Sequence, residues 1–268
     1  MNIRILTAIM IFTAVAPLRA QTLPGLDAPV SATAGAEPTE PSSEQLSRFP
    51  STIGHRSLYV SFYASRKHKK RQLIEETNWD EITESAIVHG FRVVFVRSST
   101  GTLKRDAAGG WLYGEPVSTI NESVYVVTSK GVALRTVYSV ASGLAGDYAL
   151  RRQEILESYA DESREEFIGE LQNWILPFPL DPGSRRAWTV DENSYYKVLR
   201  GGDKRFLHAS FRKTAVGVAG FIGGEWAMTR WFSPKDGLVL METYNADPGV
   251  DHKKFPFKAK ALAVYAAR

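Results

Sequence analysis

The sequence predicts an α+β fold in which two helices pack on an antiparallel β-sheet. Several segments alternate apolar and polar side chains with the two-residue period of a strand. Short turns rich in glycine, proline and aspartate separate neighbouring strand segments, as they do in antiparallel hairpins. Between Asp147 and Ile175 the apolar period changes to that of a helix. Hairpins interrupted by one helical stretch are typical of this fold class.

The N-terminus has the three regions of a secretory signal peptide. Arg4 supplies the positive charge, residues 5–16 are apolar, and Ala20 offers a small residue for cleavage. The apolar run is shorter than the ~20 residues that a membrane-spanning helix needs, so we do not expect a transmembrane protein. We expect a signal peptide over residues 1–20 and a periplasmic or secreted mature chain.

Composition excludes several classes of function. The chain contains no cysteine, which excludes thiol nucleophiles, thiolate metal ligands and disulfides. Its formal net charge is +4, and loss of the two arginines of the leader, Arg4 and Arg19, would reduce that charge to +2. A charge this small does not indicate a nucleic-acid partner.

The remaining chain divides into a tether and one domain. Residues 21–50 are rich in Pro, Ala, Thr, Ser and Glu and hold few large apolar side chains. Such a segment buries too little surface to offset the entropy of ordering, so we predict a disordered tether. Residues 51–268 are predicted to form a single sheet domain with a helical insertion near residues 147–175.

The first half of this domain is predicted to hold strands and one short helix. Trp79, Ile82 and Ala86 recur at helical spacing and predict a helix over residues 78–88. The strands are expected at residues 57–65 and 91–99, and in a hairpin of residues 124–128 and 132–140 around a turn at 129–131.

The helical insertion is predicted to contain two helices. Ser163 and Glu166 form a capping-box pattern at the start of the second helix. Acidic residues nearby fit a solvated helix start better than a carboxylate site, because acids are favourable at that end of the helix dipole. The apolar stripe of the second helix consists of Phe167, Ile168, Leu171, Trp174 and Ile175, and Pro177 and Pro179 are expected to end it.

The last third returns to the strand period. Glycines at 217, 220, 223 and 224 predict bulges or a strand corner. One hairpin is expected from residues 194–200 and 205–214, another from residues 225–232 and 238–244 around a Pro-Lys-Asp-Gly turn, and a final strand from residues 255–265.

Two motifs in this region resemble known proteins. ILPFPLDPGSRRAW (175–188) and WFSPKDGLVLMET (231–243) resemble segments of exported β-rich families of unknown function. The second motif is also similar to a hairpin of the periplasmic lipoprotein carriers. The resemblance covers roughly the last third of the chain. It implies a strongly curved antiparallel sheet, an open half-barrel, with helices on its concave side and an apolar cavity that takes acyl chains.

Several strands are apolar on both faces, which leaves two interpretations open. Trp231 and Phe232 must point to opposite sides of one strand. Either both faces are covered by core, or one face lines a partly empty groove for a lipid or acyl ligand. The candidate groove residues are Trp231, Phe232, Leu238, Leu240, Phe95 and Trp174.

A basic segment follows the first strand and also has two interpretations. It is either a solvated link or an electrostatic handle for anionic lipid or lipopolysaccharide. Its charged residues are Arg66, Lys67, Lys69, Lys70 and Arg71.

The sequence shows no recognisable catalytic, metal or cofactor motif. The five histidines lack zinc-helix spacing, and two Ser-x-x-Lys matches at Ser194 and Ser210 lack the accompanying motifs of penicillin-recognising enzymes. We therefore predict a non-catalytic periplasmic protein, without metal or cofactor, that binds a lipid-like or lipoprotein ligand in an apolar groove. The alternatives are a structural or adaptor module that has a protein partner in an envelope complex, and a hydrolase with dispersed active-site residues.

Overall fold

The computed structural model describes residues 42–65, 67, 70–107, 110–139, 147–171, 173–178, 180, 185–187, 195–199 and 207–263. The predicted signal peptide, the tether up to residue 41 and the end of the last predicted strand lie outside these residues. Within them, no helix is long and apolar enough to cross a membrane.

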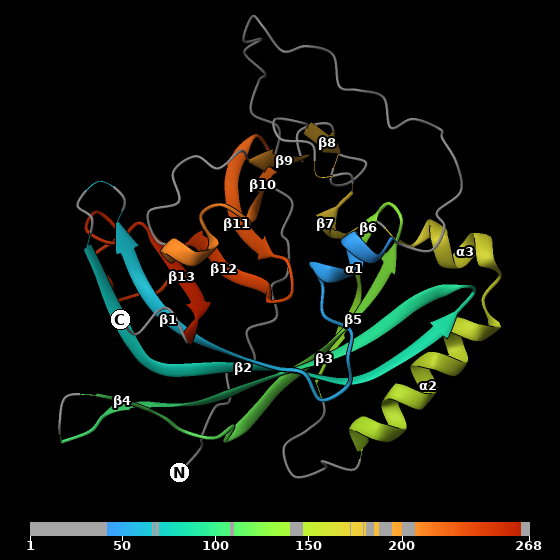
Figure 1. Ribbon diagram of the computed structural model, residues 1–268, viewed down its shortest axis with the longest axis horizontal. Coiled ribbons are helices and arrows are strands. Elements are labelled where there is room, and N and C mark those ends of the chain that lie inside the picture. The colour runs from blue at the N-terminus through green and yellow to red at the C-terminus, as the bar shows by residue number, and fades with distance from the viewer. Residues whose placement is uncertain are drawn as a thin grey trace, which may run out of the picture.

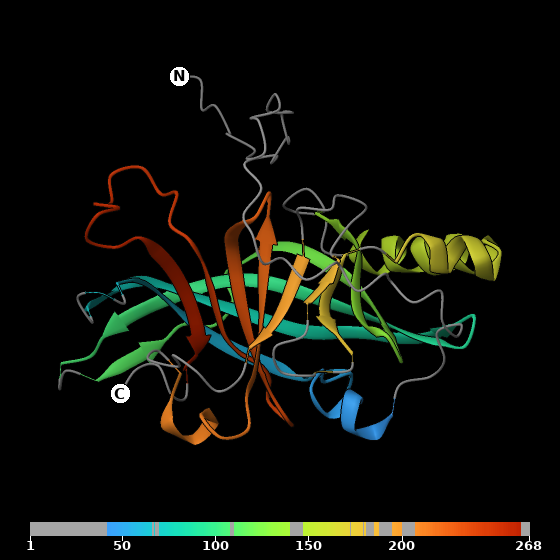
Figure 2. The same cartoon turned by 90° about the horizontal axis from the view of Figure 1, so that it is seen from above.

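One strongly curled antiparallel sheet forms a half-barrel (Figures 1 and 2). Its strand order is β7-β6-β5-β3-β2-β1-β13-β12-β11-β10-β9-β8, and β4 pairs with β3. The strands are β1 Arg56–Ser65, β2 Lys70–Val88, β3 Phe91–Arg105, β4 Trp111–Tyr113, β5 Ser118–Thr128, β6 Gly131–Tyr138, β7 Trp174–Pro177, β8 Arg185–Ala187, β9 Tyr195–Leu199, β10 Val216–Ile222, β11 Glu225–Ser233, β12 Gly237–Tyr244 and β13 Phe257–Leu262. The helices are α1 Ser43–Ser47, α2 Asp147–Asp161, α3 Arg164–Gly169 and the 3₁₀ turn η1 Ala209–Phe211.

The inner face of the curled sheet is filled by its own side chains. Val94 of β3, Leu176 of β7, Val218 of β10 and Phe232 of β11 belong to one buried cluster, although their strands lie far apart in the sheet order. Strands from the two ends of the sheet can share a cluster only on the inside of the curl. This contact closes the half-barrel over an apolar interior.

The two main helices lie on the opposite, outer face of the sheet. Phe95 of β3 belongs to a second cluster with Ile155 and Tyr159 of α2 and Phe167 of α3. Figure 1 shows α2 running below β3 while α1 lies above it. The helices therefore pack on the sheet as predicted, but they do not cover its concave side as the family resemblance implied.

The predicted tether ends earlier than Pro50. Residues 43–47 form α1, and Leu46 and Phe49 pack onto the inner cluster, with the Phe49 ring 5.2 Å from that of Tyr125. Ser47 also accepts a backbone hydrogen bond from Lys235. Two large apolar side chains and this hydrogen bond thus hold residues 42–50 on the domain.

The helix predicted over residues 78–88 is wrong. These residues belong to β2, which pairs with β1 on one side and β3 on the other. Trp79 and Ile82, which helical spacing placed together, lie on opposite faces of this strand: Trp79 lines a pocket, whereas Ile82 belongs to the inner cluster. Long-range pairing overrides a local helical pattern of only three residues.

The other predicted elements of the first half are confirmed. The strands at residues 57–65 and 91–99 are confirmed as parts of β1 and β3. The predicted hairpin is formed by β5 and β6, which close at Thr128 and Gly131.

The helical insertion is confirmed in part. α2 and α3 are present, and Ser163 and Glu166 form the predicted capping box. However, α3 ends at Gly169, and Trp174 and Ile175 continue as strand β7, where Trp174 pairs with Ala133 of β6. Glycine is a poor helix former, and the open edge of β6 offers the following residues a strand partner.

The last third differs from the prediction at one hairpin. β9 pairs with β10, not with residues 205–214, of which 209–211 form η1. β10 then turns into β11 through Gly223 and Gly224, whose φ angles of 58° and 82° suit a tight two-residue hairpin. The predicted hairpin of β11 and β12 is confirmed, with Ser233 opposite Gly237, and β13 lies within the last predicted strand.

The capping box gives a first prediction. Ser163→Ala should lower the free energy of unfolding by about 1 kcal/mol because the Glu166 backbone N–H loses its acceptor. Hydrogen bonds from Ser163, the backbone one first, lower the pKa of Glu166. The stabilisation that the Glu166 carboxylate contributes to the folded state is therefore present above the unfolded-state pKa of glutamate, and it is lost as pH falls through the lower folded-state value. Denaturant unfolding at neutral and acidic pH measures both the loss in Ser163→Ala and this dependence on pH. The exposed Ser158→Ala in α2 is the control and should show no such loss.

Candidate functional site

The six predicted groove residues do not share one surface. Trp231 and Leu240 belong to a first cluster, Phe95 to the second cluster under α2, and Phe232 to the inner cluster. Leu238 and Trp174 are half-buried, and each contacts two clusters. Both faces of these strands are apolar because both are covered.

The packing around Trp231 leaves no room on its strand. A methyl group at Gly217 of the neighbouring β10 would lie 2.8 Å from the Trp231 ring. Glycine is therefore required at this position to let the indole lie flat across β10. Trp231 itself is only 2% exposed. Burial in a filled core accounts for this aromatic residue.

The predicted basic segment surrounds the turn from β1 to β2. Lys67 and Arg71 are exposed, and Lys70 begins β2. Arg66 and Lys69 lie outside the described residues. The described part of the segment is compatible with both interpretations made from the sequence.

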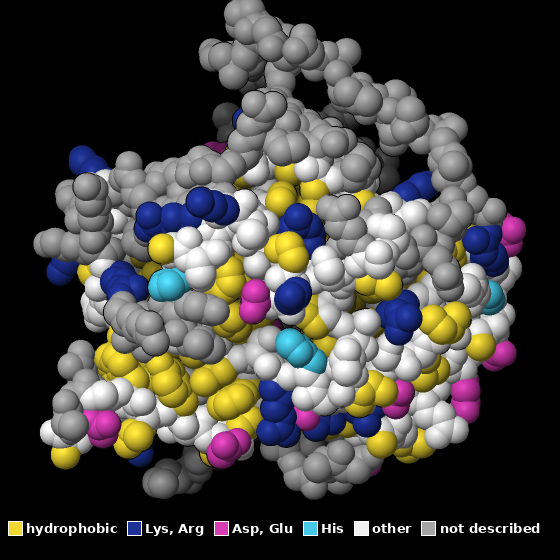
Figure 3. Space-filling view, in the orientation of Figure 1, with side chains coloured by type: hydrophobic (Ala, Val, Ile, Leu, Met, Phe, Trp, Pro, Cys, Tyr) yellow, Lys and Arg dark blue, Asp and Glu magenta, His cyan; other side chains and the backbone are white. Residues whose placement is uncertain are grey.

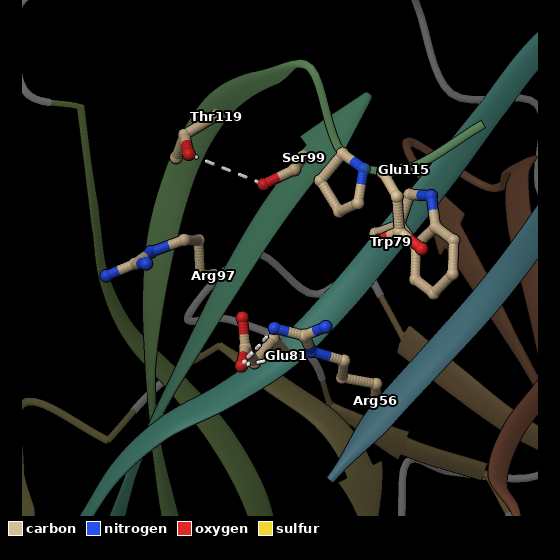
Figure 4. A pocket seen from close by; sticks show the side chains of 8 residues that line it. Arg56, Trp79, Glu81, Arg97, Ser99, Glu115 and Thr119 are labelled. Carbon is tan, nitrogen blue, oxygen red and sulfur yellow. Dashed lines mark hydrogen bonds and ion pairs between the residues drawn. The ribbon is translucent and has the colours of Figure 1, made fainter. Parts of the chain in front are cut away.

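A polar pocket of about 260 Å³ lies on the outer face of the sheet (Figure 4). Its walls come from β1, β2, β3, β5 and the connection from β4 to β5. The lining residues are Arg56, Trp79, Glu81, Arg97, Ser99, Glu115, Pro116 and Thr119.

One wall of the pocket is a cross-strand row of alternating charge. Arg56 of β1 lies opposite Glu81 of β2, Glu81 opposite Arg97 of β3, and Arg97 opposite Glu122 of β5. Arg56 Nε donates to Glu81 Oε1 at 3.1 Å. Opposite charges on directly facing strands attract one another, and the ion pairs of this row join Arg56 to Glu81 and Arg97 to Glu122.

Glu122, at the β5 end of this row, has a fully buried carboxylate. Glu122 is 0% exposed and accepts hydrogen bonds from Thr83 at 2.7 Å, from Arg152 at 3.0 and 3.2 Å, and from the Tyr138 hydroxyl. Burial, followed by the hydrogen bond to Glu122, raises the pKa of Tyr138 well above its usual range. Because Arg152 belongs to α2, this network ties the helix to the sheet beside the pocket.

Arg97 stands between this network and the pocket. Its Nε lies 3.5 Å from Glu122 Oε1, and its guanidinium lies over the Tyr148 ring at 5.2 Å from the ring centre. The side chain is 28% exposed and lines the pocket. Glu122 and Tyr148 therefore hold the Arg97 guanidinium, which points away from Trp79 and Ser99 in Figure 4.

The second wall combines an aromatic ring with hydroxyl groups. Trp79, Ser99 and Thr119 lie opposite one another on β2, β3 and β5, and the two hydroxyls are 3.4 Å apart. Trp79 Nε1 donates to the carbonyl of Gly114 at 3.2 Å, which fixes the indole beside Glu115. The connection from β4 to β5, which carries Glu115, is called the lip of the pocket. Figure 4 shows the ring and the Glu115 side chain together at one side of the pocket.

The lip lies directly against β3 because β3 has a glycine, Gly101, at the point of contact. A Cβ atom at Gly101 would come within 2.8 Å of the Gly114 carbonyl oxygen. Backbone hydrogen bonds of 2.8 Å join Gly114 to Thr102 and Val117 to Thr100 on either side. The connection carrying Glu115 is thus held against the strand.

The pocket can recognise a ligand by hydrogen bonds without a net charge of its own. The lining holds two arginines and two glutamates, so its formal charges cancel. Arginine offers donors, glutamate offers acceptors, and the hydroxyls offer both. The lining contains no histidine or lysine, and across the described residues no group of His, Asp and Glu could hold a metal ion.

Sequence reasoning missed every residue of this pocket. The misread helix over residues 78–88 removed Trp79 and Glu81 from the sheet. Read as a strand, their period of two would have placed them on one face, as it does Arg97 and Ser99 of β3. The register that places Trp79 and Glu81 opposite Ser99 and Arg97 depends on pairing between the two strands, so it cannot be read from either segment alone.

Comparison with known proteins gives one structural likeness. No protein-family model and no curated protein matches the chain. A solved structure from Bacteroides fragilis, provisionally described as an exported protein with a YmcC-like fold, is 14% identical with a TM-score of 0.33. The match covers 80% of this chain and 96% of the other.

Proposed function

We propose that this chain is a non-catalytic binding protein whose outer pocket holds a neutral, hydroxyl-rich ligand of about one or two sugar rings. The observation that carries the proposal is the combination of Trp79 with charge-balanced hydrogen-bonding groups in one pocket of about 260 Å³. Drug-sized ligands occupy pockets of about 300–1,000 Å³, so the volume fits a smaller molecule.

The chemistry of a saccharide matches the lining. Its hydroxyls both donate and accept, so they can bridge a guanidinium and a carboxylate such as the Arg56–Glu81 pair. Its C–H faces are apolar and can lie on the flat indole of Trp79. A charged ligand is disfavoured because Glu81 and Glu115 oppose an anion and the two arginines oppose a cation.

We infer a periplasmic or secreted location from the sequence pattern of residues 1–20. An extracytoplasmic chain without cysteine must be stabilised by its core. Three buried clusters within the described residues are consistent with this requirement.

A lipid-like or lipoprotein ligand in an apolar groove is the alternative that the sequence suggested. It has less support because the six proposed groove residues are distributed over three buried clusters. An adaptor role in an envelope complex has no described feature that favours it. The hydrolase alternative would have to use Glu81 and Glu115, the two carboxylates of the pocket, because the lining offers no other ordinary acid or base.

The test is a binding titration of the protein with neutral monosaccharides and disaccharides, followed by calorimetry or chemical-shift changes. We expect Trp79→Ala to weaken binding roughly tenfold, since an aromatic contact contributes about 0.5–1.5 kcal/mol beyond its area. Glu115→Gln at the exposed lip should weaken binding without changing the unfolding transition.

Trp226→Ala is the matched control, because this half-buried indole does not line the pocket and should leave the affinity unchanged. The proposal is wrong if no neutral saccharide binds, or if both pocket variants bind as the wild type does. Preferential binding of fatty acids would instead favour the acyl alternative, and turnover of a glycoside that Glu115→Gln abolishes would favour the hydrolase.

A further inference from the structure

Four strand ends meet at one rim of the sheet. β1 and β13 pair as far as Ala64 and Phe257, and β2 begins opposite Ser65. β12 ends at Tyr244, which also lies opposite Phe257. The end of β1 and the connection of residues 245–256 therefore lie side by side, as Figures 1 and 2 show, although they are far apart in sequence.

This rim gathers basic side chains from both segments. Lys67 comes from the β1–β2 turn, Arg71 from the start of β2, and Lys253 and Lys254 from the 245–256 connection; all four are exposed. Together with Lys258 at the start of β13, these residues are called the basic rim.

The two carboxylates of the 245–256 connection are both engaged. Asp247 accepts hydrogen bonds from the Tyr63 hydroxyl at 2.7 Å and from Lys258 at 3.2 Å, and the Tyr63 bond is the main reason why the pKa of Asp247 is lowered. Asp251 Oδ1 accepts from the backbone N–H groups of Lys253 and Lys254 at 3.0 and 3.2 Å. The acids thus shape the connection and leave the side chains of its two adjacent lysines exposed to solvent.

Exposed aromatic surface adjoins these charges. Tyr244 is 61% exposed, and its ring stacks on that of His252 with 6.4 Å between centres. Trp226, half-buried, meets Phe257 edge-on at 6.5 Å.

The helical end of the molecule carries the opposite charge. Between Asp147 and Leu171, the stretch of α2 and α3, the sequence has eight acidic and three basic residues, whereas residues 66–71 have five basic residues and no acid. Figure 1 places α2 and α3 at the far end of the sheet from the rim, and Figure 3 shows Asp and Glu side chains at that end in the same view. Such a separation of charge turns the basic end of a protein toward a negative surface.

We propose that the basic rim docks the protein on a leaflet of anionic phospholipid, with the lysines at the headgroup phosphates and Tyr244 in the interfacial layer. Exposed aromatic rings beside lysines suit a membrane interface, where tyrosine and tryptophan are enriched. A soluble polyanion would engage the charges alone.

Docking at the rim leaves the pocket accessible. Arg56 of the pocket begins β1 and Ser65 at the rim ends it, so the two sites lie up to about 30 Å apart along this strand. The inference does not depend on the function proposed for the pocket, and either can fail alone.

The experiment is co-sedimentation of the protein without residues 1–20 with vesicles of phosphatidylcholine, with and without phosphatidylglycerol. Residues 1–20 are omitted because their apolar run would itself enter a bilayer. We expect binding only to the anionic vesicles, and weaker binding as salt increases. Lys253→Ala with Lys254→Ala should reduce the partition coefficient roughly 30-fold, the equivalent of about 1 kcal/mol for each lysine.

The matched control is Lys130→Ala with Lys235→Ala, which removes the same charge from two exposed turns outside the rim and should reduce binding only slightly. A second rim variant, Tyr244→Ala, should weaken binding to anionic vesicles without altering its dependence on salt. Equal losses in the two double variants, or equal binding to neutral vesicles, would overturn the proposal. So would retention on a soluble anionic polysaccharide without binding to the vesicles.

Discussion

Replacing Glu122 with glutamine is expected to lower the free energy of unfolding by about 3–5 kcal/mol. Glutamine keeps the shape of the side chain but removes the negative charge that faces Arg152 at 3.0 Å and Arg97 at 3.5 Å. Breaking a buried ion pair at one partner leaves an uncompensated charge in a medium that solvates it poorly. Chemical denaturation of Glu122→Gln against the wild type measures the loss.

Glu81→Gln is the matched control, because Glu81 belongs to the same cross-strand row. Its partner Arg56 is 52% exposed at the side chain and Glu81 is 30% exposed, so solvent screens the pair. We expect a loss below about 1 kcal/mol there. Equal and small losses at both positions would show that the Glu122 network does not hold α2 on the sheet.

Replacing Phe232 with alanine is expected to cost about 3–5 kcal/mol of folding free energy. The ring is 1% exposed and lies in the inner cluster, between strands from the two ends of the sheet. Its removal leaves a cavity that the surrounding strands cannot fill without breaking their register. Denaturant unfolding with calorimetry checks the value.

Phe221→Ala gives the comparison at a half-buried ring, which stacks on Tyr195 at 4.8 Å. Loss of that stack should cost about 1 kcal/mol. A near-neutral Phe232→Ala would contradict the filled interior and return support to an apolar groove, because a side chain that lines an empty space contributes little to stability.

The two predictions test the two faces of the sheet separately. Glu122 lies on the outer face with α2 and the pocket, whereas Phe232 lies on the inner face that the curl closes. The proposed saccharide site depends on the outer face alone. Residual binding in a destabilised but folded Phe232→Ala protein is therefore expected.

Elements with strong local signals could be predicted from the sequence. Alternation in residues 57–65 and 91–99, the Pro-Lys-Asp-Gly turn and the Ser163–Glu166 capping box each correspond to the observed element. These features depend on neighbours within a few residues, so one segment carries the whole cause.

Elements that depend on distant partners were misassigned. Residues 78–88 form a strand because β1 and β3 flank them, and Trp174 extends as a strand because β6 has an open edge. The double glycine at 223–224 is a typical signal for a two-residue hairpin. The prediction missed it because it interpreted the four nearby glycines together as bulges or a strand corner.

By itself, the sequence determined the class of fold, the region of the chain that holds the two main helices and the absence of thiol chemistry. The tertiary structure alone decided which face the helices cover, how the six apolar candidates are divided among three clusters, and that Trp79, Glu81 and Arg97 line one pocket. The physical reason is that strand register and sheet curl arise from pairing between segments distant in sequence. A shift of one residue in any pair would send the same side chains to the opposite face.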